Sequence, residues 1–114
     1  MANDAAYVNV AEGSARVMSN MKLYVKLLTK FRTDNNLGDL EASIAAGDMA
    51  KAQNAAHTIK GVAANLALSE LFKQCLELET QIKNGAVNPA QLETVKTVFA
   101  ATLREIDKVT AENG

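Results

Sequence analysis

The 114-residue chain has one cysteine, one proline, one histidine and no tryptophan. A single cysteine, Cys75, cannot form an intramolecular disulfide, so we expect a reducing compartment, namely the cytoplasm. A zinc site needs three or four histidine, cysteine or carboxylate ligands, so one histidine and one cysteine on different predicted helices predict no metal site. The scarcity of proline, together with many Ala, Leu, Lys and Glu residues, indicates an all-helical protein.

Charge and hydrophobicity exclude further classes of protein. The net charge is −1, and this lack of basic excess argues against nucleic-acid binding. No apolar run is long enough to span a membrane, and the polar start Met1–Asp4 lacks the basic region of a signal peptide. The sequence has no glycine-rich phosphate loop and no Walker-type lysine motif, so we expect no nucleotide site.

Apolar residues recur at helical spacing along most of the chain. They predict long helices over 21–32 or 33, 49–66, 70–83 and 89–110, and short accessory helices over 5–16 and 37–46. The expected N-caps are Ser19 or Asn20, Asp48, Ser69 and Asn88. Short connections favour an antiparallel four-helix bundle in a single domain over 1–114, with its core at about 20–111 and a frayed end at 111–114.

The one histidine, His57, lies in the middle of the predicted helix 49–66. At roughly 100° per residue, one stripe of this helix is apolar and has the spacing of a face buried in a bundle. The stripe consists of Met49, Ala52, Ala56, Ile59, Ala63 and Leu66. His57 lies roughly 140° from the centre of this stripe, so we expect its imidazole to face solvent.

Short side chains surround His57 on this outer face, where an ordinary helix carries Lys, Glu, Gln or Arg. They belong to Ala50, Asn54, Gly61 and Ala64. Glycine inside a helix costs about 1 kcal/mol relative to alanine, so Gly61 indicates a place that another molecule must approach closely. Gly61 could instead pack against a neighbouring helix, although it lies opposite the buried stripe. Lys60, three residues after the histidine, places an ammonium beside the ring.

These residues favour His57 itself as a nucleophile. Thr58 points to a different face and Cys75 lies on an apolar stripe, so neither forms a catalytic pair with the histidine. A neutral imidazole can attack phosphorus and then pass the phosphoryl group onward. Lys60 would offer charge-assisted hydrogen bonds to the phosphoryl oxygens, and the absent side chain of Gly61 would let another protein's active site reach the ring.

The motif His57-Thr58-Ile59-Lys60-Gly61, followed by Ala64-Asn65-Leu66, resembles the signature of histidine phosphotransfer (HPt) domains. Further matches lie in Tyr24-x-x-Leu27-Leu28-x-x-Phe31, Ala46-Gly47-Asp48 and Cys75-x-x-Leu78-Glu79. The resemblance covers about residues 20 to 85 by motif and the rest by helix count. Ile59 replaces the commoner leucine, and Ala67 replaces a common glycine at the turn, which concerns the helix end and not the chemistry.

The resemblance implies a phosphoryl carrier and not an enzyme with its own kinase site. His57 would accept a phosphoryl group on its outer ring nitrogen and exchange it with an aspartate of response-regulator receiver domains, in a phosphorelay that includes a hybrid sensor histidine kinase. The receiver would bring Mg²⁺ and the acidic pocket, so this chain would need no cofactor of its own. Lys60 would be the phosphate-neighbouring cation and Gly61 the access position, with Asn54 and Ala64 beside them on the partner-access surface.

Antiparallel geometry indicates one further residue. If two helices turn back near residue 67, the level of His57 on the second helix is about ten residues past the turn, near Glu77 to Glu79. HPt domains often place a polar side chain there, so we expect Glu79 to bond the inner ring nitrogen and fix its tautomer. Glu79 also counts among the partner-access residues, and a plain surface acid is the alternative for it.

A non-catalytic adaptor is the second hypothesis for the whole chain. Such an adaptor would dock a receiver domain or a partner helix through the same face without chemistry. Lys60 and Gly61 favour phosphotransfer, because docking does not need a cation beside an exposed imidazole. We expect a monomer, because a single nucleophile on a convex face needs no second subunit, and a free-standing protein, because the chain begins with Met1 and ends in polar residues.

Overall fold

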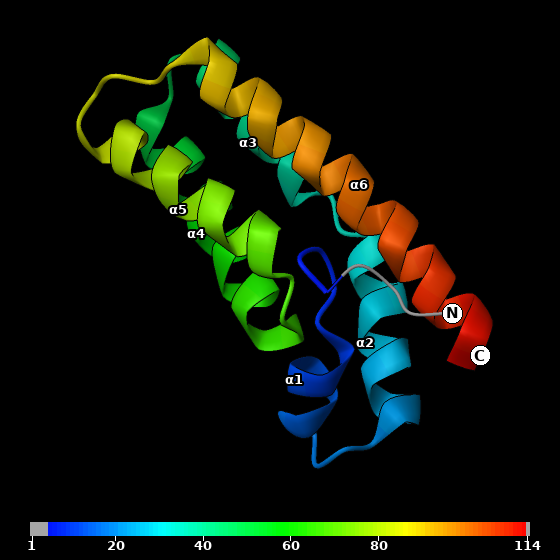
Figure 1. The fold of residues 1–114 in the computed structure, drawn as a ribbon. Helices are drawn as coiled ribbons and strands as arrows, with labels where there is room; N and C mark the ends of the chain where they lie inside the picture. The colour runs from blue at the N-terminus through cyan, green and yellow to red at the C-terminus, as the bar shows by residue number, and fades with distance from the viewer. Residues whose placement is uncertain (1–4, 114) are drawn as a thin grey trace.

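A computed structural model describes residues 5–113, and the predictions about Met1–Asp4 and Gly114 lie outside this range. Over the described residues the chain forms six α-helices and no strand (Figure 1). The helices are α1 (Val10–Ala15), α2 (Met21–Arg32), α3 (Asn36–Ala45), α4 (Met49–Leu66), α5 (Ser69–Lys83) and α6 (Pro89–Asn113). The predicted all-helical class is confirmed.

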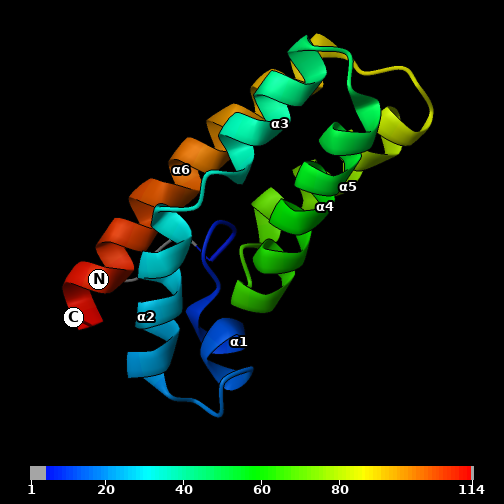
Figure 2. The same ribbon diagram turned by 180° about the vertical axis from the view of Figure 1, so that it is seen from behind.

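Four long helices, α2, α4, α5 and α6, form the bundle. Helices α4 and α5 pack along one another as an antiparallel pair, and α6 runs back beside α5 and continues along α2 (Figure 1). Helix α3 packs on α4, and the view from behind shows α3 and α4 together on that side (Figure 2). Ion pairs Arg32–Asp107 (3.3 Å) and Glu41–Lys96 (3.8 Å) join α2 and α3 to α6.

Three predicted N-caps are confirmed. The side-chain oxygens of Asn20, Asp48 and Asn88 accept hydrogen bonds from the first-turn amides of α2, α4 and α6, which satisfies donors that a helix start leaves free. The prediction for Ser69 is wrong, because Ser69 is the first residue of α5 and Leu68 holds the N-cap position. The amide of Glu70 instead donates to the carbonyl of Ala6 at 2.8 Å.

The N-terminal segment differs from the predicted helix 5–16. Its helix is confined to Val10–Ala15, and Asn9 caps it. The residues before it form an arm that lies on the α4–α5 turn, where the Asn9 amide donates to the Ala67 carbonyl at 3.0 Å. Val8 on this arm is fully buried. The accessory helix is therefore shorter than predicted, and the arm before it contributes an apolar side chain to the core.

The buried face of α4 follows the predicted stripe, except that Met49 is half-buried and Ala55 is buried as well. Aromatic packing closes the core between α2 and α6, where the Phe31 and Phe99 ring centroids lie 5.3 Å apart. Phe72 is half-buried and packs at the edge of the core. The last helix continues to Asn113, so the predicted fraying of 111–113 is wrong.

Tyr24 fixes the end of the helix that carries His57. Its buried hydroxyl donates to the carbonyl of Leu66 at 2.7 Å, which satisfies one of the acceptors that a helix end leaves free. Burial, with a smaller contribution from Glu12, raises the pKa of Tyr24 to about 12. Gly13 of α1 lies so close to this ring that an added Cβ would overlap the hydroxyl, so α1 and α2 meet here by close approach.

Ala67 ends α4 in the left-handed conformation, with φ of 58°. The Leu68 amide donates to the Ala63 carbonyl and the Ala67 amide to the Ala64 carbonyl, the pairing that usually has glycine at this position. Ala67 therefore forms the helix end that glycine more commonly forms at this position.

Cys75 lies in the core of α5 and is fully buried. Burial, and next the charge of Glu79, raise the pKa of its thiol to about 12, while Lys60 opposes the shift. Because the thiolate is the reactive form, we expect the folded protein to resist alkylation by iodoacetamide at about pH 8, and the urea-unfolded chain to react fully. Mass spectrometry measures both, and rapid modification of the folded protein would contradict this packing of α5.

Candidate functional site

His57 projects from the middle of α4 into solvent. Its side chain is 68 % exposed, as its position opposite the buried stripe predicts. The helix is held on both sides of the histidine, by the Asp48 cap at its start and by Tyr24 at its end. The backbone under the imidazole is therefore fixed, while one face of the ring remains open to a partner.

Glu79 of α5 meets the inner side of the ring. His57 Nδ1 and Glu79 Oε2 are 3.1 Å apart, because the antiparallel α4–α5 pair brings these two levels together. The predicted contact is confirmed, and the alternative of a plain surface acid is wrong. The Glu79 side chain is only 4 % exposed, so its assignment to the partner-access surface is also wrong: it lies beneath that surface.

Two ammonium groups share the same carboxylate. Lys60 Nζ lies 2.6 Å from Glu79 Oε1, and its side chain is 19 % exposed. Lys83, one turn further along α5, places its Nζ 3.8 Å from Glu79 Oε2 and is 56 % exposed. One carboxylate oxygen thus faces Lys60, and the other faces both the imidazole and Lys83.

These contacts keep Glu79 ionised. Burial by itself would raise the pKa of this carboxyl, but the contact and charge of Lys60, the hydrogen bond with His57 and the charge of Lys83 outweigh it, so the pKa lies below the ordinary value of 4.5. A buried carboxylate is costly unless it is paired and hydrogen-bonded. The three partners of Glu79 compensate this cost, so α5 can carry a buried carboxylate beside the core.

The ionised carboxylate determines the tautomer of His57. A carboxylate accepts hydrogen bonds and cannot donate them, so the proton of this contact belongs to Nδ1. In a neutral imidazole the other nitrogen then has a free lone pair. Nε2 is therefore the nucleophilic atom of the site, and it lies on the side of the ring away from Glu79.

Gly61 has no packing role within the described chain. It is exposed, and an added Cβ would meet no atom of another element within 4 Å. The alternative of a glycine packed against a neighbouring helix is therefore excluded. The absent side chain leaves the ring open from the C-terminal direction of α4, on the same face as His57.

The two other predicted access residues lie on either side of the histidine. Asn54 is exposed and borders a hollow of about 460 Å³ between α3 and α4, which Asp39, Lys51 and Thr58 also line. Ala64 is half-buried and borders a smaller hollow of about 210 Å³ between α4, α5 and α1. The structure thus places Asn54, Gly61 and Ala64 around His57, and it moves Glu79 below them.

Lys83 is the residue of this cluster that the sequence did not indicate. Its signal is the spacing of four residues from Glu79, which places two side chains on one helix face. That spacing places Lys83 in the cluster only because Glu79 points at His57. Among residues 5–113, no three His, Cys, Asp or Glu side chains lie close enough together to hold a metal ion.

Glu79→Gln tests the charge of this cluster through stability. The pKa of Glu79 is lowered in the folded protein, so its charge stabilises the fold above the ordinary value of 4.5 and this contribution is lost as pH falls through the folded value. We expect the variant to lose about 1 to 3 kcal/mol of unfolding free energy near neutral pH. The deficit should shrink steadily in acid.

Urea denaturation from neutral pH to about pH 3 measures this dependence. Glu77→Gln, an exposed acid on the same helix, is the matched control and should show little change at any pH. A deficit of Glu79→Gln that stays constant over the whole range would contradict a stabilising carboxylate charge.

The described residues thus form a helical bundle that holds one exposed histidine against a buried carboxylate. The family model described as Hpt domain matches residues 26–109 of the chain, and the chain therefore belongs to this family. Comparison with curated proteins and with solved structures gave no match. No helix within 5–113 has the length and apolar character needed to cross a membrane.

Proposed function

We propose that this protein carries a phosphoryl group on His57 and exchanges it with an aspartate of response-regulator receiver domains in a two-component phosphorelay. The family implies phosphotransfer by a histidine. The observation that supports His57 is its combination of exposure and anchoring. The ring is 68 % exposed, while its Nδ1 is bound to a carboxylate that is 4 % exposed.

The transfer step follows from the tautomer. The lone pair of His57 Nε2 attacks the phosphorus of an aspartyl phosphate, the N–P bond forms, and the P–O bond to the aspartate breaks with its electron pair on the leaving carboxylate. The proton on Nδ1 stays in place, so the phosphorylated ring is cationic. In the reverse step an aspartate oxygen attacks phosphorus, and the N–P electron pair returns to Nε2.

Glu79 stabilises this cationic ring. A preorganised charge facing the place where opposite charge develops lowers the barrier to its formation. Glu79 is already ionised and lies 3.1 Å from Nδ1, so no proton moves when the ring becomes cationic. Lys60 holds the other carboxylate oxygen, so the role predicted for it, that of a cation beside the phosphoryl group, would require it to leave Glu79.

The partners supply the remaining chemistry. We propose that a hybrid sensor histidine kinase feeds the relay, and that the receiver brings Mg²⁺ and its acidic pocket to His57. The chain itself would act as a carrier without a nucleotide site. We further propose a monomer in the cytoplasm, because one exposed nucleophile is complete within one chain.

A transfer assay tests the proposal. A panel of receiver domains is loaded with labelled phosphate, and the protein is added. We expect the label to move to this chain within minutes for at least one receiver, and to be acid-labile and base-stable, as a phosphorus–nitrogen bond at histidine is. Back-transfer to an unlabelled receiver should follow.

Two outcomes would contradict the proposal. Label that is stable in acid would indicate an ester and not a phosphohistidine. A folded protein that binds a receiver but takes no label from it would favour the adaptor hypothesis instead.

A further inference from the structure

We propose that Lys83 is the ammonium that moves to the phosphoryl group on His57, while Lys60 remains paired with Glu79. The inference rests on the proposed function and assigns different roles to Lys60 and Lys83. It starts from the way in which the Glu79 carboxylate is shared among His57, Lys60 and Lys83.

Lys60 is held firmly in the unmodified protein. Its Nζ lies 2.6 Å from Glu79 Oε1 and its side chain is 19 % exposed. Removing it from this oxygen would leave the carboxylate with less compensation, and an uncompensated buried charge costs several kcal/mol. Lys60 is therefore the cation that keeps Glu79 ionised and in place.

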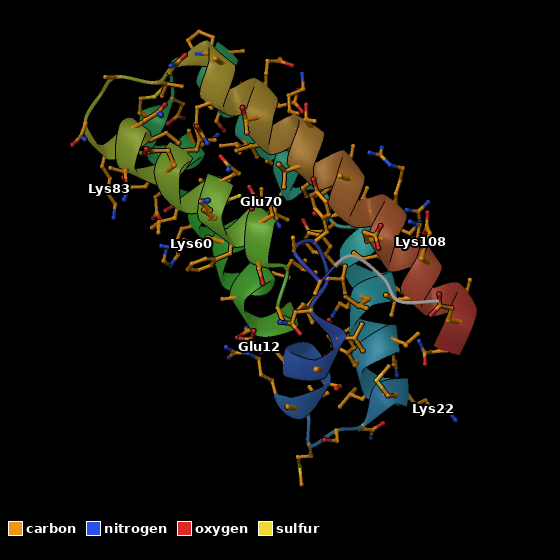
Figure 3. The ribbon with its side chains drawn as sticks, in the orientation of Figure 1. Glu12, Lys22, Lys60, Glu70, Lys83 and Lys108 are labelled. Carbon is orange, nitrogen blue, oxygen red and sulfur yellow. The ribbon has the colours of Figure 1, made fainter. Side chains whose placement is uncertain are left out.

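Lys83 is held loosely and lies on the side of the imidazole. Its Nζ is 3.8 Å from Glu79 Oε2, the oxygen that also contacts His57 Nδ1, and its side chain is 56 % exposed. A pair of this exposure contributes little to stability, so the long side chain can leave it at small cost. Figure 3 shows Lys60 and Lys83 on the outer side of the α4–α5 pair.

The net charge of the cluster falls to about zero when the phosphoryl group arrives, because the ring becomes cationic in the same step. In the unmodified protein, two ammonium groups and one carboxylate leave one net positive charge beside a neutral ring. A phosphoryl group adds about 1.5 to 2 negative charges. The dianionic oxygens attract the exposed ammonium more strongly than a carboxylate that already has Lys60 and a cationic imidazole as partners.

The test uses Lys83→Met, which removes the charge and retains most of the chain length. The proteins are loaded with phosphoramidate, a small phosphoryl donor, so no receiver takes part. Phosphorus NMR then follows the phosphoryl resonance as pH is varied. A nearby ammonium favours the dianion, so its loss should move the titration midpoint upward by about half a pH unit.

Two further variants make the result specific. Lys83→Arg retains the charge and should titrate like the wild type. Lys108→Met is the matched control, because Lys108 is 55 % exposed, lies in an ion pair with Glu105 and sits on α6 away from the site (Figure 3). It should also titrate like the wild type.

The inference is overturned if Lys83→Met titrates like Lys108→Met, or if phosphoramidate cannot load His57 in the wild type. Failure of the proposed function is distinguishable, because it would leave the wild type loaded by phosphoramidate and unable to exchange its phosphoryl group with any receiver. Equal unfolding midpoints in urea for the two methionine variants exclude a folding defect as the cause of a shift.

Discussion

Replacing His57 with glutamine should reduce phosphotransfer by at least about 1,000-fold, to the limit of detection. Glutamine has a similar reach but no nitrogen with a free lone pair. The fold should survive, because the imidazole is 68 % exposed. The loss of one hydrogen bond to Glu79 should lower the unfolding free energy by only about 0.5 to 1.5 kcal/mol.

Three measurements on the His57→Gln variant separate chemistry from binding. Labelling from a phosphorylated receiver reports transfer, urea denaturation reports stability, and calorimetric titration reports receiver affinity. We expect the first to vanish and the other two to change little. Transfer that persists in a well-folded variant would show that another residue takes the phosphoryl group.

The second large effect concerns Gly61→Gln. The added side chain has room within the protein, since a Cβ at this position meets nothing within 4 Å, but it would occupy the space through which a receiver reaches Nε2. We expect transfer to fall by at least about tenfold, because small misplacements of reacting groups cost this much or more. The stability of the variant should rise by about 0.5 to 1 kcal/mol, because glutamine is the better helix former.

Gly61→Gln should thus lower transfer while it raises stability, so a folding defect would not explain the loss of transfer. Gly61→Ala should gain about as much stability while transfer falls less, because a methyl group blocks less space. Ala100→Gln, exposed on α6, is a control for added bulk and should leave transfer unchanged. Normal transfer in Gly61→Gln would mean that the partner approaches His57 by another route.

The sequence predicts the long helices because local signals define them. Apolar periodicity fixes their extent, and Asn20, Asp48 and Asn88 mark three of their starts. The start of α5 is mispredicted because the amide of its second residue, Glu70, is satisfied from a distance by the carbonyl of Ala6. A backbone contact between segments so far apart leaves no pattern in the residues.

The sequence predicts the part of the site that lies on α4. It predicts the contacts between α4 and α5 less well. Periodicity alone turns His57 and Gly61 outward. Counting residues from the turn finds the level of Glu79, but it does not fix the rotation of α5 about its axis. That rotation decides that Glu79 is 4 % exposed, that it pairs with Lys60, and that Lys83 belongs to the cluster.

The central claim is that Glu79 holds the Nδ1 proton of His57 and leaves Nε2 to carry the phosphoryl group. Nitrogen NMR of the histidine-labelled protein, before and after phosphorylation, tests it directly. We predict a protonated Nδ1 in the unmodified ring, and phosphorus coupling at Nε2 afterwards with the Nδ1 proton retained. A phosphoryl group coupled to Nδ1, or an unmodified ring with its proton on Nε2, would contradict the account.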